Sequence, residues 1–182
     1  LILGASGGVG SFAVQLAHHA GAHVTAVCSQ RKADFVRGLG ADRVLDYAQD
    51  DPTRPKTPYD LIVDIFGGLP LARLRRALTP KGILVIVGGT PGKILCISRQ
   101  LYAVLLSPFV SHTIKMFVSN PKRPELLHLA ELAAQGPLTP AVGVTYPLRE
   151  LPEALKKLAC SGTEGKIVVA PSTSPLDSLE GT

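Results

Sequence analysis

The chain has 182 residues, of which 46% are hydrophobic and 18% are charged. This length and composition predict a globular protein with one domain of about 130 to 150 residues and a short appendage. The formal net charge is +5, but the basic residues are dispersed apart from short clusters at 31–32, 73–76 and 122–123. A nucleic-acid partner is therefore not expected, because neither a continuous basic stripe nor an aromatic stacking platform is evident.

Membrane insertion and disulfide bonding are not expected either. The most apolar run, residues 101–118, is interrupted by serines, a proline, a histidine and a lysine, so it fits a buried or partner-facing segment. Cys28, Cys96 and Cys160 are widely spaced and odd in number, which favours a reducing compartment and a cytoplasmic location. No signal peptide is recognised, and because the chain begins inside an expected strand, two alternatives stay open: the chain is a fragment that lacks its true N-terminus, or an upstream domain is absent.

The first ten residues predict a strand, a tight turn and the start of a helix. Three apolar residues lead into a cluster of four glycines, and residues 12–17 then show apolar helical periodicity. The unpaired amides at a helix N-terminus attract anions, and glycine lets a pyrophosphate approach the main chain. The dinucleotide fingerprint G-x-G-x-x-G fits here with alanine at its first position. It predicts a pyrophosphate site at Ala5, Ser6, Gly7, Gly8, Val9 and Gly10.

The same residues also satisfy G-x-S-x-G, the nucleophile elbow of serine hydrolases. Ser6 would be the nucleophile, and Asp64 with His112 or His128 could complete a triad. An elbow normally follows several strands, and this interpretation leaves Gly10 without a role. The dinucleotide site is therefore favoured. A glycine turn without any ligand is disfavoured, because glycine at a helix start costs stability.

The second expected strand indicates which coenzyme the chain prefers. Residues 22–28 read as a buried parallel strand, and its end should meet the adenosine ribose, where an Asp or Glu would bind the 2′-hydroxyl of NAD. The chain instead has Ser29, Arg31 and Lys32, with no carboxylate before Asp34. A hydroxyl and two cations suit a 2′-phosphate, so NADPH (NADP) is the predicted cofactor. The alternative is a helix start with solvated cations.

The rest of the chain continues to alternate strands and helices. The expected strands are 43–47, 59–64, 83–87 and 113–118, and the expected helices are 32–39, 70–78, 94–106 and 124–135. Three prolines in 48–58 predict that the crossover helix there is short or replaced by a loop. Two strands end in paired glycines, which admit a flat ring at the carboxyl edge of a sheet. The nicotinamide should therefore lie between Phe66, Gly67, Gly88 and Gly89.

The expected architecture is an α/β doubly wound parallel sheet of the Rossmann type, with strand order 3-2-1-4-5-6. Residues 1–136 would form this domain, 137–170 a C-terminal segment, and 171–182 a disordered tail. The helix at 124–135 should turn its apolar side chains inward, namely Leu126, Leu127, Leu129, Ala130 and Ala133. His128 on the same helix is expected to be a surface or core histidine, not a metal ligand.

Four stretches together resemble the cofactor-binding half of the medium-chain dehydrogenase/reductase superfamily, nearest its zinc-independent quinone oxidoreductase-like branch. They are Leu3 to Gly10, Leu39 to Tyr47, Leu106 to Val110, and Tyr146 to Leu148 with Gly165 to Val169. The resemblance implies that Ser6 to Val9 hold the pyrophosphate. It also implies that Ser29, Lys32 and Tyr47 surround the 2′-phosphate, and that Phe66, Gly67 and Gly88 border the nicotinamide.

The resemblance implies an NADPH-dependent oxidoreductase that reduces a small molecule, either a quinone or an activated enone or aldehyde. Members of the family carry a GroES-like catalytic domain, on which a segment like 137–170 normally packs, so no catalytic residue is nominated here and the chain alone is expected to be inactive. Zinc is not expected. The turn at 162–164 departs from the basic or histidine-containing turn of many relatives. Residues 113–118 could join two sheets in a homodimer, and an NADPH sensor or scaffold without turnover is the alternative function.

Overall fold

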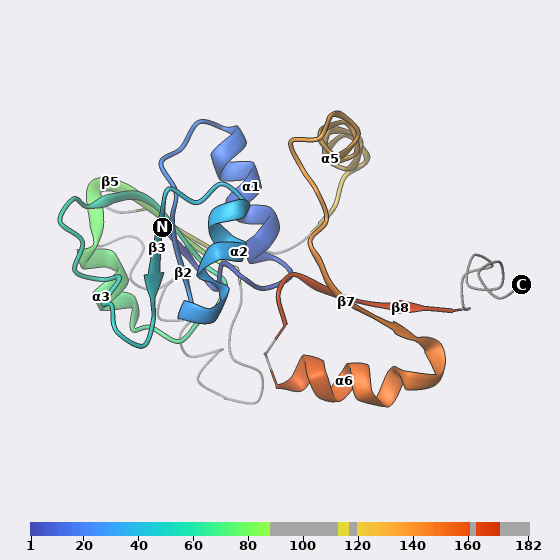
Figure 1. The fold of residues 1–182 in the computed structure, drawn as a ribbon. Coiled ribbons are helices and arrows are strands. Elements are labelled where there is room, and N and C mark those ends of the chain that lie inside the picture. The colour runs from blue at the N-terminus through green and yellow to red at the C-terminus, as the bar shows by residue number, and fades with distance from the viewer. Residues whose placement is uncertain (88–112, 117–119, 161–162, 172–182) are drawn as a thin grey trace, which may run out of the picture.

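A six-stranded parallel sheet organises the N-terminal part of the chain (Figure 1). The computed structural model describes residues 1–87, 113–116, 120–160 and 163–171. The strands are β1 (Ile2–Leu3), β2 (Thr25–Cys28), β3 (Arg43–Asp46), β4 (Tyr59–Asp64), β5 (Leu78–Ile86) and β6 (Thr113–Met116). Their order is β3-β2-β1-β4-β5-β6, and every neighbouring pair is parallel. The expected doubly wound α/β fold is confirmed.

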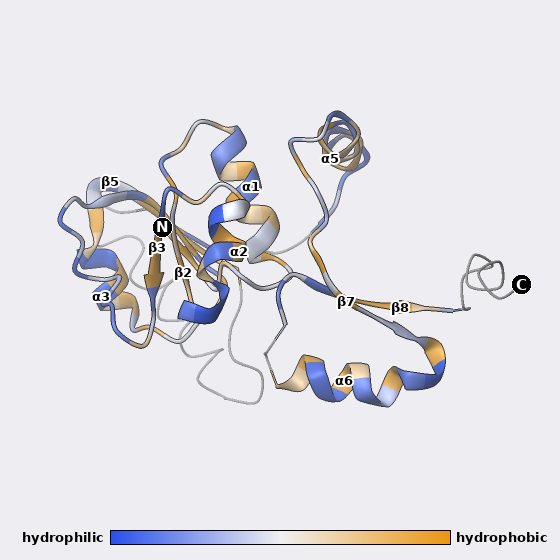
Figure 2. Ribbon diagram, in the orientation of Figure 1, coloured by the Kyte–Doolittle hydropathy of each residue, from blue (hydrophilic) through white to orange (hydrophobic). Residues whose placement is uncertain are grey.

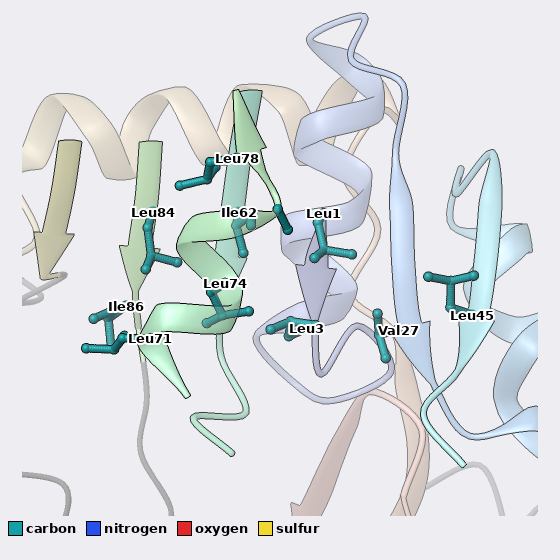
Figure 3. Close-up of a cluster of buried hydrophobic side chains, with 11 residues drawn as sticks. Leu1, Leu3, Val27, Leu45, Ile62, Leu71, Leu74, Leu78, Leu84 and Ile86 are labelled. Carbon is teal, nitrogen blue, oxygen red and sulfur yellow. The ribbon is translucent and has the colours of Figure 1, made fainter. Parts of the chain in front are cut away.

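Alternation along the strands divides the buried side chains between the two faces of the sheet. On one face, Ile2 and Ala26 pack with Val14 of α1 (Gly10–His19) and with Val36 of α2 (Ala33–Gly38), which follows a short 3₁₀ turn, η1 (Gln30–Lys32). On the other face lies a larger cluster under α3 (Leu71–Arg76), drawn in Figure 3. It comprises Leu1, Leu3, Val27, Leu45, Ile62, Leu71, Leu74, Ala77, Leu78, Leu84 and Ile86. Both faces are therefore covered, as a parallel sheet requires.

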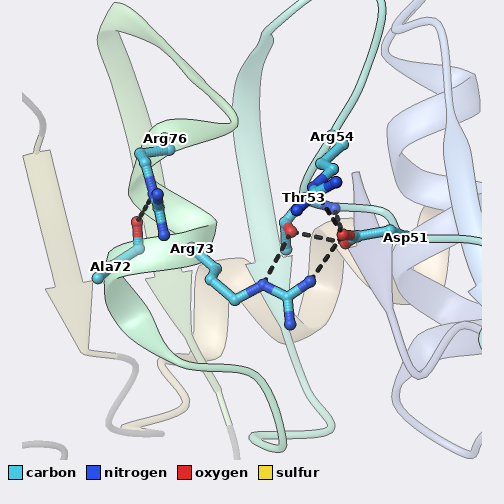
Figure 4. Close-up of polar contacts among 6 residues, drawn as sticks. All are labelled: Asp51, Thr53, Arg54, Ala72, Arg73 and Arg76. Atoms are coloured by element: carbon cyan, nitrogen blue, oxygen red, sulfur yellow. Dashed lines mark hydrogen bonds and ion pairs between the residues drawn. The ribbon is translucent and has the colours of Figure 1, made fainter.

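The connection between β3 and β4 contains no helix, as its prolines predicted, and a polar clamp holds it against α3 (Figure 4). Arg73 of α3 donates from Nη2 to Asp51 Oδ2 at 2.7 Å and from Nε to Thr53 Oγ1 at 3.2 Å. The hydroxyl of Thr53 in turn donates to Asp51 Oδ1 at 2.6 Å. Hydrogen bonds from Thr53, followed by Arg73, lower the pKa of Asp51 below its ordinary value. The clamp thus takes the place of a crossover helix.

The boundary between α3 and β5 differs from the expectation. The helix expected over 70–78 ends at Arg76, and the strand expected over 83–87 already begins at Leu78. The cause is a contact with β4: the amide of Tyr59 donates to the carbonyl of Ala77 at 2.8 Å, and Tyr59 pairs with Leu78. The register then shifts, so that Leu61 pairs with Ile83. Pairing between strands therefore overrides the local helical pattern.

The C-terminal elements include a second, two-stranded sheet. They are α5 (Arg123–Gln135), β7 (Val142–Pro147), a 3₁₀ turn η3 (Leu148–Glu150), α6 (Leu151–Ala159) and β8 (Lys166–Ala170). Strands β7 and β8 pair in parallel, and with α6 they extend away from the larger sheet (Figures 1 and 2). The proposed domain boundaries stay predictions. The helix expected at 94–106 and all of the tail beyond residue 171 lie outside the described residues.

The inward orientation expected for the leucines of α5 is wrong. Leu126, Leu127 and Leu129 are 54%, 53% and 38% exposed, and Ala130 and Ala133 are exposed as well. Leu132 is the buried residue of this helix. The periodicity correctly identified an apolar face, but a periodic pattern does not say whether the chain supplies anything to cover that face. Among the described residues, no helix is long and apolar enough to cross a membrane.

The two kinds of leucine give a stability test. Leu84 is fully buried in β5, whereas Leu126 is 54% exposed on α5. We expect Leu84→Ala to lower the free energy of unfolding by about 2 to 5 kcal/mol, because it removes buried methyl groups and leaves a cavity. Leu126→Ala should change it by less than about 0.5 kcal/mol. Urea unfolding followed by circular dichroism measures both, and equal effects of the two variants would contradict the assigned core.

Candidate functional site

The turn between β1 and α1 is built on close contacts of the main chain that only glycine allows. Gly4 has a φ of +83°, a region that L side chains rarely adopt. A Cβ on Gly10 would lie 2.1 Å from the carbonyl oxygen of Gly4 and 2.7 Å from Ala5 Cα. The first turn of the helix is therefore pressed against the end of the strand. In this fold, such packing leaves the helix N-terminus pointing at the carboxyl edge of the sheet.

The amides at this N-terminus are available to a ligand. Ser11 donates its amide to the carbonyl of Gly7 at 2.9 Å and Ala13 donates to Val9 at 3.1 Å, so the helical bonds begin there. Within the described part of the chain, the amides of Gly8, Val9 and Gly10 donate to no acceptor. Three free donors at the positive end of a ten-residue helix suit an anion. The residues present thus fit the pyrophosphate of a dinucleotide.

Residues 165–166 of the C-terminal segment lie over the glycine turn between β1 and α1. This contact was not predicted from the sequence. The amide of Gly165 donates to the carbonyl of Ser6 at 2.9 Å, and Gly165 also forms a parallel bridge with Gly7. The side chain of Lys166 follows and crosses Gly8, where an added Cβ would lie 2.8 Å from Lys166 Cδ and 3.1 Å from its Nζ. This ammonium also lies 5.8 Å from the centroid of the Phe12 ring. The segment thus adds a cation beside the free amides.

The residues expected around the adenosine ribose are gathered at the ends of β2 and β3. The amide of Tyr47 donates to the carbonyl of Cys28 at 3.2 Å, and the Tyr47 side chain is 67% exposed. Arg31 is exposed and Ser29 half-buried. Lys32 is only 9% exposed, and its Nζ donates to the carbonyl of Thr163 at 2.8 Å. One of the two cations nominated for the 2′-phosphate therefore also anchors the C-terminal segment.

The end of β4 forms the third wall of the site. Asp64 is fully buried, and its Oδ1 accepts the amide of Gly67 at 2.8 Å, which shapes the loop after the strand. Phe66 is 64% exposed, and its ring lies so close to Gly68 that a Cβ there would be 2.2 Å from it. The backbone of Phe66 also lies beside Gly4. The Phe66 ring thus lies over Gly68, and the Phe66 backbone is at van der Waals distance from Gly4. Gly88 and Gly89, the other residues expected near the nicotinamide, lie outside the described residues.

Sequence reasoning missed Thr163 and Lys166, which contact the nominated residues from more than a hundred positions away. The available signal was the Gly165-Lys166 pair at the start of an apolar strand, since a glycine there can permit close approach of another backbone. Gly165 has a φ of +62°, and a Cβ on it would lie 2.1 Å from the carbonyl of Ala141. No local pattern, however, indicates which backbone it approaches.

Neither a metal site nor a hydrolase triad is assembled by the described residues. Among them, no three His, Cys, Asp or Glu side chains lie close enough to hold a metal ion. Asp64 shapes the Gly67 loop, and no described side chain hydrogen-bonds to the hydroxyl of Ser6. His128 lies on α5 and is exposed, and His112 lies outside the described residues. The geometry therefore gives no support to the nucleophile elbow, and the expectation about zinc stays a prediction.

Comparison with known proteins establishes the family. The profile of the family described as zinc-binding dehydrogenase matches residues 39–169. The chain is 34% identical over 175 residues to the chloroplast envelope quinone oxidoreductase homolog of Arabidopsis thaliana, covering 94% of this chain and 52% of that protein. It is 34% identical over 185 residues to the mitochondrial NAD(P)H oxidoreductase RTN4IP1 of Bos taurus, covering 93% of this chain and 47% of that protein.

The solved structures agree with the sequence relatives. The quinone oxidoreductase from Coxiella burnetii superposes with a TM-score of 0.75 at 25% identity, covering 92% of this chain and 51% of that one. The chain therefore belongs to the zinc-binding dehydrogenase family of the medium-chain dehydrogenase/reductase superfamily, in its quinone oxidoreductase-like part. The resemblance to the cofactor-binding half of this superfamily is confirmed, and the zinc independence of the branch stays a prediction. The chain spans about half the length of the curated relatives it matches.

Two glycine substitutions test the packing of the turn. Gly10→Ala should abolish cooperative folding or lower the free energy of unfolding by more than about 3 kcal/mol, because its Cβ would overlap the backbone of Gly4. Gly38 is the matched control, since it lies in α2 with nothing within 4 Å of its added Cβ. Gly38→Ala should be neutral or stabilise by up to about 1 kcal/mol. Thermal unfolding distinguishes them, and a Gly10→Ala variant as stable as the wild type would contradict the packing.

Proposed function

We propose that the chain binds NADPH, with the pyrophosphate on the free amides of Gly8, Val9 and Gly10. The observation that carries this proposal is the contact of Gly10 with the carbonyl of Gly4, which aims those amides at the carboxyl edge of the sheet. Lys166 supports it from the other side, because its ammonium lies next to Gly8. The ammonium group and the helix N-terminus both carry positive charge, so both attract the same anion.

The ribose end supports NADPH over NADH. Ser29, Arg31 and Lys32 place a hydroxyl and two cations after β2, where a 2′-phosphate would lie. The name of the Bos taurus relative, an NAD(P)H oxidoreductase, is compatible with either coenzyme. Preference for the phosphorylated form is thus a proposal from this chain's own residues.

In the intact protein we propose transfer of hydride to a quinone or to an activated enone or aldehyde. The reduced nicotinamide supplies the hydride when the coenzyme is bound, and this domain would hold and orient the nicotinamide ring. The Arabidopsis thaliana relative, a quinone oxidoreductase homolog by name, supports the quinone. The buried carboxylate of Asp64 would hold the loop that contains Phe66 beside the nicotinamide ring. Cytoplasmic location stays a prediction, since relatives are chloroplast and mitochondrial proteins by name.

The C-terminal sheet would pack on a catalytic domain. The side chains of Leu148, Leu151, Leu155 and Leu158 are 53%, 39%, 56% and 62% exposed on η3 and α6. Their spacing places these residues in an apolar stripe along η3 and α6, and Figure 2 shows hydrophobic and hydrophilic segments alternating along the α6 ribbon. An exposed stripe of this kind marks a surface that another protein unit covers. The stripe and the family relationship together support the proposal that a catalytic domain is that unit.

Lys166 provides the test of the coenzyme site. Lys166→Met should weaken both NADPH and NADH about tenfold, because the lost cation faces the pyrophosphate that the two coenzymes share. Lys81→Met is the matched control, since Lys81 is exposed in the irregular part of β5. Fluorescence titration of the reduced nicotinamide measures all three proteins. Wild-type protein that binds neither coenzyme would refute the proposed function, and unchanged affinity in Lys166→Met would refute the role of Lys166.

The edge of the larger sheet supports a dimer proposal. Strand β6 is the last strand of the sheet, and it pairs only with β5 among the described residues. An unpaired edge can add a strand from a second copy of the chain. Gel filtration with light scattering should give twice the mass of the chain at micromolar concentration. A monomer throughout that range would contradict the dimer.

A further inference from the structure

The turn at Thr163 and Glu164 is fixed between the two ends of the coenzyme site. On one side of Glu164, the carbonyl of Thr163 accepts the ammonium of Lys32 at 2.8 Å. On the other side, the amide of Gly165 donates to Ser6 at 2.9 Å. Because both neighbours of Glu164 are bonded, one to η1 and one to the glycine turn, the backbone of Glu164 must lie between the ribose end and the pyrophosphate end.

The carboxylate of Glu164 acts electrostatically on the end of β2. Burial is the main cause that raises the pKa of the Cys28 thiol, and the negative charge of Asp46 raises it further, whereas Lys32 and Arg37 lower it. Glu164 makes the smallest contribution, which also raises this pKa. Cys28 is the last residue of β2 and directly precedes Ser29. The hydrogen bonds on either side of Glu164 thus bring it near the end of β2, where a dinucleotide fold places the adenosine ribose.

The other carboxylates near this end are already engaged. Asp34 pairs with Arg37 at 2.6 Å, so its charge is compensated on the surface of α2. Asp46 turns back into its own loop, where Oδ1 accepts the amide of Ala48 at 3.1 Å. Glu164 forms no ion pair among the described residues. Glu164 is therefore a carboxylate without an ion-pair partner near the adenosine ribose position, and it belongs to the C-terminal segment of the chain.

We propose that Glu164 is a specificity-determining residue that opposes Lys32 and restrains the preference for a 2′-phosphorylated coenzyme. The inference rests on the proposed function. A carboxylate beside the adenosine ribose repels a 2′-phosphate and can accept a hydrogen bond from the 2′-hydroxyl of NADH. The Lys32 to Thr163 bond fixes the backbone next to Glu164 and uses one of the three donors of the ammonium. Specificity is then a balance between an attractive and a repulsive group.

The test is the ratio of NADPH to NADH affinity, measured by fluorescence titration at low salt. Glu164→Gln and Glu164→Ala should each raise the ratio about three- to tenfold in favour of NADPH, because a negative charge is removed next to a phosphate. Glu164→Asp should keep the ratio near that of the wild type. The matched control is Glu131→Gln on the exposed surface of α5, which should leave the ratio unchanged.

The outcomes separate this inference from the proposed function. If wild-type protein binds neither coenzyme, the proposed function fails and the inference fails with it. If the wild type binds but both neutral variants keep its ratio, or shift it toward NADH, the inference alone is overturned. Should Glu164→Gln not fold, as judged by circular dichroism, the ratio of Glu164→Ala decides. A rise in the ratio in all variants, including Glu131→Gln, would also overturn it, because the effect would then be one of net charge.

Discussion

The structure depends on one close approach between backbone atoms. The start of α1 touches the end of β1 so tightly that a single Cβ at Gly10 would overlap the carbonyl of Gly4. This contact sets the direction of the helix, and with it the apolar packing of Val14 on the sheet. It also leaves the amides of the first helical turn without internal acceptors, at the edge of the sheet where doubly wound folds bind ligands. Stability and binding thus share the same few atoms.

The second feature of the site is that it is closed by a distant segment. After α6 the chain comes back to the larger sheet, where the carbonyl of Thr163 accepts a hydrogen bond from Lys32, which follows β2. The amide of Gly165 donates to the carbonyl of Ser6 in the glycine turn. The segment that leads into β7 is also fixed, because the Gln15 side chain both donates to and accepts from the backbone of Thr139 at 3.0 and 2.7 Å. The charges that we propose to face a coenzyme are consequently assembled from both ends of the chain, and the proposed balance between Lys32 and Glu164 can be changed at one end alone.

Much of this arrangement could be predicted because it is encoded locally. The glycines of residues 4–10 lie close together in the chain, and β4 begins and ends where it was expected, at Tyr59 and Asp64. The errors arise where distant contacts decide. Leu78 joined a strand because Tyr59 pairs with it. The leucines of α5 are exposed, contrary to the prediction, because the periodicity of a helix does not reveal whether another element covers its apolar face. The position of Lys166 follows from a bridge between Gly7 and Gly165, which no short motif encodes.

In the proposed function, backbone amides at the start of α1 hold the diphosphate under Lys166. The most direct measurement is a ¹⁵N–¹H correlation spectrum of the protein titrated with NADPH. The account predicts that the largest amide shifts occur at Gly8, Val9 and Gly10, with smaller shifts at Gly165 and Lys166. Saturating coenzyme that leaves those amides unmoved, while shifting residues elsewhere on the surface, would contradict it.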